Sequence, residues 1–497
     1  MSDLPLSELD AQGARVLAWV HEYLAHPERH RVLPAVAPGD IRRQLPARPP
    51  RTGEPLAAIL DDFERVVLPG ITHWNHPAFF AYFAISSSIP GILGETLAAA
   101  LDVNGMLWKT SPAATELEQV VLDWLRGMVG LPDDAGWFGL ITDTASISTL
   151  LALAAAREAV ELDVRERGLA GRADLPALRV YCSEHAHSSV DKAAITLGLG
   201  HANVVKVATD AEYRMRPELL REAMAADVAR GMRPIACVAT VGTTSTTSVD
   251  PLRDVAAVCG DYGAWLHVDG AYGGVAGLVP ELRWAMDGVE LADSLVVNPH
   301  KWLFTPVDCS ALWTRHPQVL KRAFALVPEY LTTSTDDVAP NLMDYGVQLG
   351  RRFRALKLWM VIRAFGVDGL AERIGAHCAL AREFAAWVEA EAGWETCAPV
   401  PFSLVCFRHV PRALAGDETA LAAHNARIMD VVNASGRAFL SHTRLGERWV
   451  LRLAIGNIRT ERAHVAEAWA LLREAAASTV AERAGTDAHA DARAGAA

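Results

Sequence analysis

The sequence lacks the marks of a membrane protein, a nucleic-acid-binding protein and a disulfide scaffold. No run of about 18 apolar residues occurs, and the acidic N-terminus has no apolar signal core, so neither a membrane span nor a secretory signal is predicted. Lys and Arg number 47 against 59 Asp and Glu, a net charge of −12 that argues against a general nucleic-acid binder. The seven scattered cysteines contain no C-x-x-C, which fits reduced thiols in the cytoplasm.

Length and composition describe a folded chain of several units. The 497 residues are 51% hydrophobic and 21% charged, which excludes wholesale disorder. At roughly 150 residues per domain, this length predicts about three domains or subdomains. Residues 481–497 carry no large apolar side chain, so this tail is expected to be disordered.

The N-terminal segment, residues 1–85, is predicted to be helical. One apolar helical stripe with i, i+3, i+4, i+7 and i+8 spacing is formed by Val16, Trp19, Val20, Tyr23 and Leu24. A second stripe at 56–67 follows a proline-rich break at 45–55. Because a few helices without a sheet make a weak core, we expect this segment to pack on a partner subunit.

From residue 86 to 370, short β-rich runs alternate with helical or loop segments. This alternation predicts a large α/β domain with a mainly parallel, seven-stranded sheet. The predicted strands lie at 139–142, 177–182, 203–207, 235–240, 264–268, 294–297 and 310–314. Functional side chains of such sheets follow the carboxyl ends of the strands.

The remainder is predicted to form a small α+β domain, residues 371–480. A long helical stretch at 353–393 leads into it. Its strands are predicted at 403–408, 437–441 and 448–455, with helices between and after them.

Two strand ends carry residues suited to one kind of chemistry. Lys301 follows a predicted strand beside aromatic and apolar residues, which would lower the pKa of its amine and favour a Schiff base, although most such lysines are simply exposed. Asp269 ends another strand and precedes small residues, a position also typical of a turn cap. A Schiff-base lysine with a carboxylate partner for a ring nitrogen is what pyridoxal phosphate (PLP) chemistry requires.

Two further segments fit the same cofactor. Small hydroxylated residues at 142–149, including Ser146, precede a long helix, whose N-terminus can bind a phosphate; ordinary N-capping explains this segment equally well. His187 follows another strand and offers a flat ring for stacking. His73 and His76 are spaced like metal ligands, but nothing completes a metal site, so no metal is predicted.

Longer stretches resemble a known family. The chain is closely similar to the aromatic-L-amino-acid decarboxylases, group II PLP-dependent decarboxylases of fold type I, in NPHKW, HVDGAYGG, AHSSVDKA, TSPAATELE, HWNHPAFFAYF and LGRRFRALKLW. The resemblance spans about residues 55 to 475. It implies a fold type I, PLP-dependent transferase-like architecture and a homodimer. It also implies decarboxylation of tryptophan, tyrosine, phenylalanine or DOPA to the arylalkylamine and CO2.

The resemblance also implies roles for individual residues. Lys301 would hold PLP covalently, Asp269 would pair with the ring nitrogen, and Tyr330 would deliver a proton from a mobile loop. The other implied cofactor contacts are Ala145, Ser146, His187, Thr244, Ala271, Asn298 and His300. The implied substrate-binding residues are Trp74, Tyr82, Phe83, Met106 and Gly350, the last leaving room for an indole ring. Asp143 departs from the family, which often has glycine there.

Three alternatives stay open at this point. Aldehyde synthases of the same family typically carry Phe at the position of Tyr330. A decarboxylase of a non-aromatic amino acid such as glutamate would need a basic pocket cluster, and none is evident. A non-catalytic interaction protein would have little reason to keep Lys301, Asp269, His187 and Tyr330 together.

Overall fold

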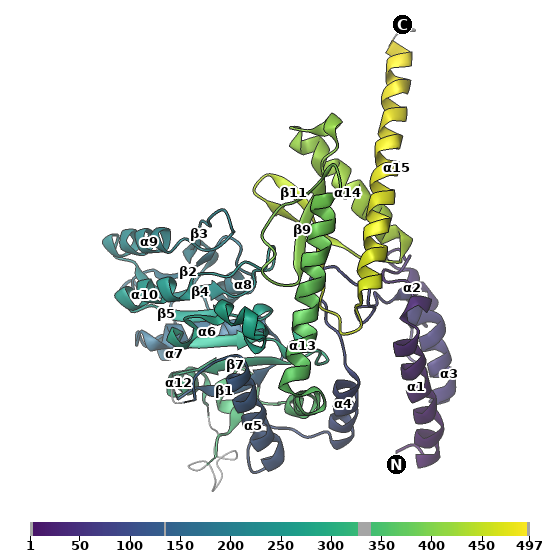
Figure 1. The fold of residues 1–497 in the computed structure, drawn as a ribbon. Helices are drawn as coiled ribbons and strands as arrows, with labels where there is room; N and C mark the ends of the chain where they lie inside the picture. The colour runs from purple at the N-terminus through teal and green to yellow at the C-terminus, as the bar shows by residue number, and fades with distance from the viewer. Residues whose placement is uncertain (1–2, 134–135, 327–338, 495–497) are drawn as a thin grey trace.

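A seven-stranded sheet forms the centre of the structure, a computed structural model that describes residues 3–133, 136–326 and 339–494 (Figure 1). Its strands, in spatial order, are β1 (Phe138–Thr142), β7 (Ser310–Thr314), β6 (Ser294–Val297), β5 (Trp265–Asp269), β4 (Arg233–Thr240), β2 (Leu178–Ser183) and β3 (Val204–Val207). Only β7 runs against its neighbours, β1 and β6. The predicted mainly parallel sheet is confirmed, with strand ends shifted by no more than two residues.

Helices cover both faces of this sheet. One face packs against α5 (Pro112–Met128), α9 (Pro217–Ala229) and α10 (Leu252–Tyr262), and the other against α6 (Ala145–Ala159), α8 (Ser189–Thr196) and α12 (Pro317–Phe324). Successive side chains of β4 alternate between the two cores: Cys237 lies in one, and Ala236 and Val238 lie in the other. Burial on both faces explains the continuous apolar runs that made these strands predictable.

A second, antiparallel sheet belongs to the C-terminal part. Its strand order is β10 (Ser441–Leu445), β11 (Arg448–Ala454), β9 (Leu404–His409) and β8 (Trp394–Thr396). The predicted strand at 437–441 is wrong: the strand begins at Ser441. Residues 438–440 are apolar because they pair with the segment 78–80, where Phe80 N–H donates to the carbonyl of Phe439 (2.9 Å). The short β8 was not predicted.

Two long helices frame this C-terminal sheet. The predicted helical stretch at 353–393 corresponds to α13 (Arg354–Ala390), interrupted at Gly366, whose φ is +67°. The last helix, α15 (Arg462–Ala494), runs out from the body to the C-terminus (Figure 1). The predicted disorder after residue 480 is therefore corrected to helix as far as Ala494. The tail is rich in alanine, which has the highest helix propensity of all residues.

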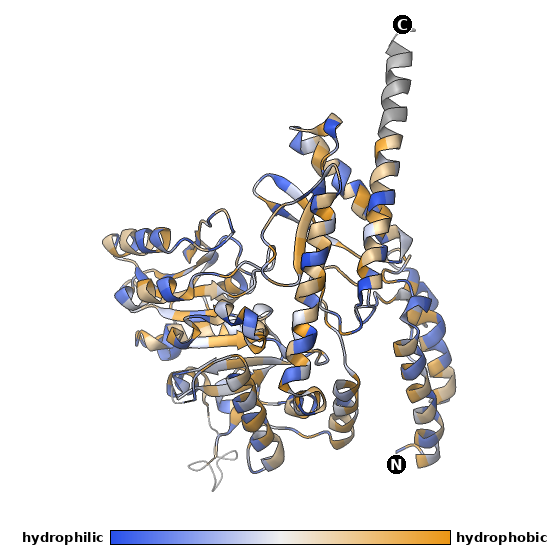
Figure 2. Ribbon diagram, in the orientation of Figure 1, coloured by the Kyte–Doolittle hydropathy of each residue, from blue (hydrophilic) through white to orange (hydrophobic). Residues whose placement is uncertain are grey.

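The N-terminal helices stand side by side at the edge of the molecule (Figure 1). The two apolar stripes fall on α1 (Leu6–Ala25) and on α3 (Leu56–Asp62) with the π-helical turn η2 (Phe63–Val67). None of the α1 residues is buried, and hydrophobic and hydrophilic bands alternate along both helices (Figure 2). Leu6, Leu9 and Leu17 are 77%, 68% and 58% exposed. The predicted stripes themselves are partly covered within the chain, where the centroid of the Trp19 ring lies 5.3 Å from that of the Phe63 ring. The leucines of α1 outside that stripe are left uncovered by a single chain.

Shorter elements connect these parts. They are η1 (Pro27–Arg29), α2 (Asp40–Gln44), η3 (Leu68–Gly70), α4 (Ile89–Leu101), α7 (Val164–Arg167), η4 (His201–Asn203), η5 (Gly273–Leu278), η6 (Pro280–Met286), η7 (Val289–Leu291), α11 (Pro299–Trp302), η9 (Leu342–Tyr345), η10 (Arg412–Leu414) and α14 (Glu418–Ser435). All seven cysteines are buried, free thiols. In the described part of the chain, no helix is both long and apolar enough to cross a membrane.

Candidate active site

The carboxyl ends of several strands of the large sheet surround one cavity of about 180 Å³. Its walls come from segments far apart in the sequence and are formed by Phe83, Thr144, Ala145, Ser146, His187, Thr240, Gly242, Thr244, Asp269, Ala271, Tyr272, Asn298, His300 and Lys301. The structure thus brings together every predicted cofactor contact. The position agrees with the rule that open α/β sheets bind ligands beyond the carboxyl edge of their strands.

Lys301 lies on α11, the single helical turn that follows β6. Its Nζ lies 5.6 Å from the centroid of the Phe83 ring. Loss of hydration lowers the pKa of Lys301 below the ordinary value of 10.5, although the carboxylate of Asp269 opposes this shift. A larger fraction of the amine is therefore neutral and nucleophilic at a given pH than in an exposed lysine.

Asp269 is the last residue of β5 and faces the same cavity. It is buried, and its Oδ1 accepts a hydrogen bond from the backbone N–H of Ala271 (3.0 Å). This bond fixes the carboxylate at the strand end. His187, on the loop after β2, accepts a hydrogen bond at Nδ1 from Ser189 N–H (3.1 Å), which leaves Nε2 as the protonated nitrogen.

The opposite end of the cavity suits an anion. Helix α6 begins at Ala145, and Thr144 and Ser146 line the cavity beside the positive end of this 15-residue helix. The Asn298 amide lies beside them. Its Oδ1 is buried without a hydrogen-bond partner among the described residues, and an anion would be bound by the Nδ2–H donors of the same amide.

His300 remains neutral in this environment. Burial and the neighbouring charge of Lys301 lower the pKa of His300 to about 3. Its Nδ1 accepts a hydrogen bond from Cys309 N–H (2.9 Å), so its protonated nitrogen is Nε2. His300 can therefore donate a hydrogen bond without adding a charge beside Lys301.

Sequence reasoning missed three residues that line the cavity, Thr240, Gly242 and Tyr272, and also Arg452, which holds the loop that carries Thr244. The Tyr272 ring stacks on Phe83 at 3.8 Å between centroids and 12° between planes. Arg452, on β11, is 3% exposed, and its Nη2 donates to the carbonyl of Thr244 (2.6 Å). The small domain thus holds a loop of the large domain in place. The one signal in the sequence that could have revealed Arg452 is a charged residue within the apolar run of β11.

Several predicted substrate residues lie outside this cavity in the single chain. Trp74 and Tyr82 form an exposed aromatic surface, with their ring centroids 5.8 Å apart. Met106 and Gly350 lie in neighbouring loops, joined where Arg351 donates its backbone N–H to Asn104 Oδ1 (3.0 Å). Their substrate roles stay predictions. Tyr330 lies outside the described residues.

Two other features from the sequence are explained locally. Asp143 does not line the cavity; its carboxylate accepts hydrogen bonds from the backbone N–H of Thr144 (2.7 Å) and from Gln348 (3.4 Å). His73 is a buried residue whose Nδ1 pairs with the Tyr23 hydroxyl at 2.9 Å. Within the described ranges, no cluster of three or more His, Cys, Asp or Glu side chains could hold a metal.

The cavity fits PLP by the chemistry of its walls. An amine of lowered pKa, a buried carboxylate, the small Ala271 and an anion-binding helix start are arranged around one narrow space. Lys301 would hold the aldehyde carbon, Asp269 the ring nitrogen, and Ser146 with Asn298 the phosphate. This fold and this site define a PLP-dependent enzyme of fold type I.

Comparison with known proteins narrows this class. The model of the pyridoxal-dependent decarboxylase conserved domain matches residues 38–410. Tyrosine decarboxylase 2 of Arabidopsis thaliana is 41% identical, over 94% of this chain and 86% of its own length. Phenylacetaldehyde synthase of the same plant is also 41% identical, over 94% and 96%. The structure of Oryza sativa TDC with PLP and tryptamine superposes with a TM-score of 0.92 at 38% identity, covering 96% of this chain and 99% of that one.

The chain belongs to the pyridoxal-dependent decarboxylase family. It is a PLP-dependent carboxy-lyase, and its cofactor is pyridoxal phosphate.

Proposed function

We propose that this enzyme decarboxylates aromatic L-amino acids to arylalkylamines and CO2. The observation that carries the proposal is the aromatic wall beside Lys301, where Phe83 is stacked on Tyr272. Of the described residues that line the cavity, none is an arginine, and Lys301 is the only lysine. An acidic substrate would need a further cation for its side-chain carboxylate, whereas an aromatic side chain needs apolar surface.

Residues of this chain position the cofactor and the substrate. Bound PLP supplies the electron sink for the pair released when the Cα–carboxylate bond breaks. The Lys301 amine would hold the cofactor in the resting enzyme, and the substrate amine would take its place during turnover. The Asp269 carboxylate keeps the proton on the ring nitrogen, and the Phe83 face orients the aromatic group. Tyr330 delivers the proton to Cα and excludes water.

We also infer a homodimer in the cytoplasm. The exposed leucines of α1, the exposed ring of Tyr82, and the position of Met106 and Gly350 outside the cavity all fit a second copy completing the substrate pocket. The seven buried thiols fit a reducing compartment.

A substrate panel tests the proposal. The purified holoenzyme is given L-tryptophan, L-tyrosine, L-phenylalanine, L-DOPA and L-glutamate, and kcat/KM is measured from CO2 release, with Lys301→Ala as the blank. We expect at least one aromatic substrate to exceed glutamate by about 100-fold or more, since a mismatched polar group in an apolar pocket is strongly disfavoured. Preference for glutamate would overturn the aromatic assignment.

The same assay tests the predicted role of Gly350, which is expected to leave room for an indole ring. Gly350→Ser should reduce the use of tryptophan more than the use of tyrosine.

A second candidate is the formation of an aromatic aldehyde, favoured by the 41% identity to phenylacetaldehyde synthase. The resemblance places Phe in such enzymes where this chain has Tyr330, so we expect amine as the main product. Tyr330→Phe keeps the ring and removes the proton donor. With dissolved O2 as the oxidant, this variant should release aldehyde, ammonia and hydrogen peroxide in place of much of the amine. Wild-type amine formation without peroxide in Tyr330→Phe would show that Tyr330 is not the proton donor.

A further inference from the structure

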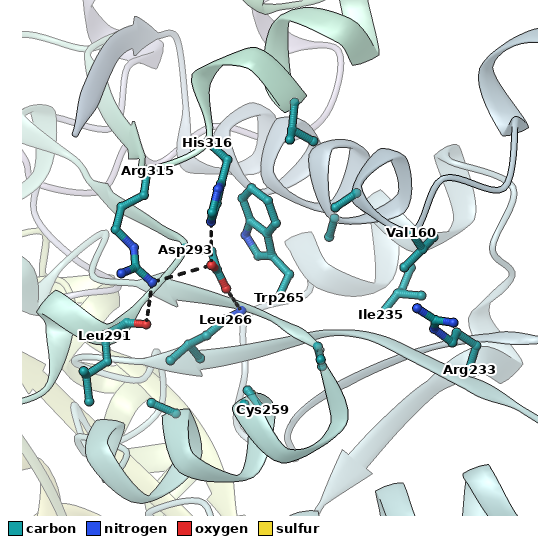
Figure 3. A pocket seen from close by; sticks show the side chains of 17 residues that line it. Val160, Arg233, Ile235, Cys259, Trp265, Leu266, Leu291, Asp293, Arg315 and His316 are labelled. Atoms are coloured by element: carbon teal, nitrogen blue, oxygen red, sulfur yellow. Dashed lines mark hydrogen bonds and ion pairs between the residues drawn. The ribbon is translucent and has the colours of Figure 1, made fainter. Parts of the chain in front are cut away.

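Two buried tryptophans of the large domain donate a hydrogen bond from the indole nitrogen. Trp265 begins β5 and donates through Nε1 to Ser294 Oγ (2.8 Å), beside a cavity of about 390 Å³ at the amino ends of β4 and β5 (Figure 3). Trp302 ends α11, directly after Lys301, and donates through Nε1 to His377 Nδ1 (3.0 Å). The second bond therefore fixes the neighbour of the lysine that would hold the cofactor.

A stack of parallel rings connects Trp302 to the aromatic wall of the active site. The Tyr272 ring lies between the rings of Trp302 and Phe83, with centroids 4.7 and 3.8 Å away and planes tilted by 4° and 12°. Tyr272 and Trp302 are 2% and 0% exposed, so neither ring can move without displacing its neighbours. Phe83, the last ring of the stack, lines the cavity beside Lys301. The position of Trp302 thus determines the position of the Phe83 ring.

His377, on α13, holds the far end of this stack. An indole N–H can only donate, so Nδ1 of His377 is the acceptor and Nε2 carries the proton. Burial lowers the pKa of His377 to about 4, although a hydrogen bond to the backbone of Asn457 opposes this shift. The ring therefore stays neutral near pH 7 and keeps its acceptor. The planes of the His377 and Trp302 rings differ by 7°, so the bond holds the indole edge in the plane of the stack.

The same histidine is connected to the chain segment that leads to Phe83. Asn457, whose backbone hydrogen-bonds the His377 ring, is fully buried. Its Nδ2 donates to the carbonyls of His76 (3.2 Å) and Trp74 (3.4 Å), a few residues before Phe83. His377 is thus linked to the Phe83 wall in two ways, through the ring stack and through this segment.

We propose that His377 is a positioning residue for the aromatic substrate: by holding Trp302, it fixes the ring of Phe83 against which the substrate ring packs. This inference rests on the proposed aromatic specificity. His377 does not line the cavity, so it acts through the other rings. Because the substrate ring contacts Phe83 in the ground state and in the transition state alike, a displaced Phe83 should raise KM and leave kcat nearly unchanged.

A histidine variant that keeps a flat ring but removes the acceptor tests the proposal. In His377→Phe the buried N–H of Trp302 has lost its partner, so the indole is expected to turn out of the plane of the stack. On the aromatic amino acid that the wild type uses best, KM should rise about tenfold while kcat stays within about threefold. His377→Asn places an amide oxygen close to the position of Nδ1 and should bring KM back to within about threefold of wild type.

Two tryptophan variants provide the matched comparison. Trp302→Phe removes the donor of the same hydrogen bond and should raise KM as His377→Phe does. The double variant should be little worse than either single one, because both changes break one interaction. Trp265→Phe makes the same substitution at the other end of β5, about 13 Å of strand from Asp269, and should leave KM unchanged.

The outcomes separate this inference from the proposed function. Wild-type KM in a cofactor-loaded His377→Phe enzyme would overturn the inference, as would a loss of kcat at unchanged KM or a failure of His377→Asn to restore KM. If His377→Phe does not fold, as judged by its cofactor absorbance, Trp302→Phe decides in its place, with Trp265→Phe as the control. A wild-type enzyme that prefers glutamate would refute the proposed function itself, whereas unchanged KM for an aromatic substrate would refute only the role of His377.

Discussion

Asp269 and Lys301 face one cavity but experience different surroundings. Asp269 is held by the N–H of Ala271, whereas Lys301 is deprived of water beside Phe83. Asp269→Asn keeps the shape and the acceptor for Ala271 but removes the charge that keeps the ring nitrogen protonated. Turnover should therefore fall about 100-fold or more. Steady-state rates, compared at equal cofactor occupancy, check this; a loss of only a few-fold would refute the role of Asp269.

The lowered pKa of Lys301 has a consequence in the cofactor-free protein. A lysine with a pKa below 10.5 loses its proton at a lower pH, and the neutral amine is the form that attacks the aldehyde of PLP. The rate of reconstitution with PLP should rise with pH and reach half its plateau below pH 10.5. Stopped-flow absorbance across the pH range measures this midpoint. A midpoint at or above that of an exposed lysine would contradict the described environment.

At this scale, the sequence identified residues that follow strands and belong to specific motifs. Lys301, Asp269 and His187 were placed in one site because parallel strands end at one edge, whereas Asn298 was implied only by the family resemblance. Arg452 was missed because it comes from the other domain, more than 200 positions after the loop that it holds. Contacts between distant segments leave no local pattern.

Among the elements, the crossing of α4 and α13 is close and depends on one glycine. A Cβ on Gly94 would lie 2.6 Å from the Cα of Lys357, so Gly94→Ala must push the helices apart and should destabilise the protein by about 1–3 kcal/mol. The matched change Gly127→Ala meets open space and should stabilise α5 by about 0.5–1 kcal/mol. Calorimetric melting temperatures should therefore shift in opposite directions. Equal melting temperatures would show that the crossing tolerates a methyl group.

Strands were predictable where burial made their side chains apolar. The strands of the large sheet have helices on both faces and appear in the sequence as apolar runs. The apolar run at 437–441 misled because such a run marks burial and not pairing within the sheet. Ala438 and Leu440 are buried where this segment pairs with residues 78–80, while β10 itself is half polar. Composition likewise suggested disorder for a tail whose alanines favour a helix.

For the whole molecule, the surface of one chain points to a second copy. On α4, Ile89, Leu93, Leu97 and Leu101 form an exposed stripe, each at least 44% exposed. Replacing Leu93 and Leu97 by Glu should convert a dimer into monomers and abolish turnover, since the substrate pocket would be incomplete. Val228→Glu, on the outer helix α9, is the control and should leave the dimer intact. Sedimentation velocity distinguishes the two, and a fully active wild-type monomer would contradict the dimer.

Product stoichiometry tests the central claim most directly. Carboxyl-labelled L-tryptophan, L-tyrosine, L-phenylalanine and L-DOPA are each incubated with the holoenzyme, and CO2, amine, aldehyde and peroxide are measured in the same reaction. The account predicts one amine for each CO2 from at least one of these substrates, without peroxide, and no product from Lys301→Ala. Failure to release CO2 from any of the four amino acids, or release of CO2 with aldehyde and peroxide in place of amine, would contradict it.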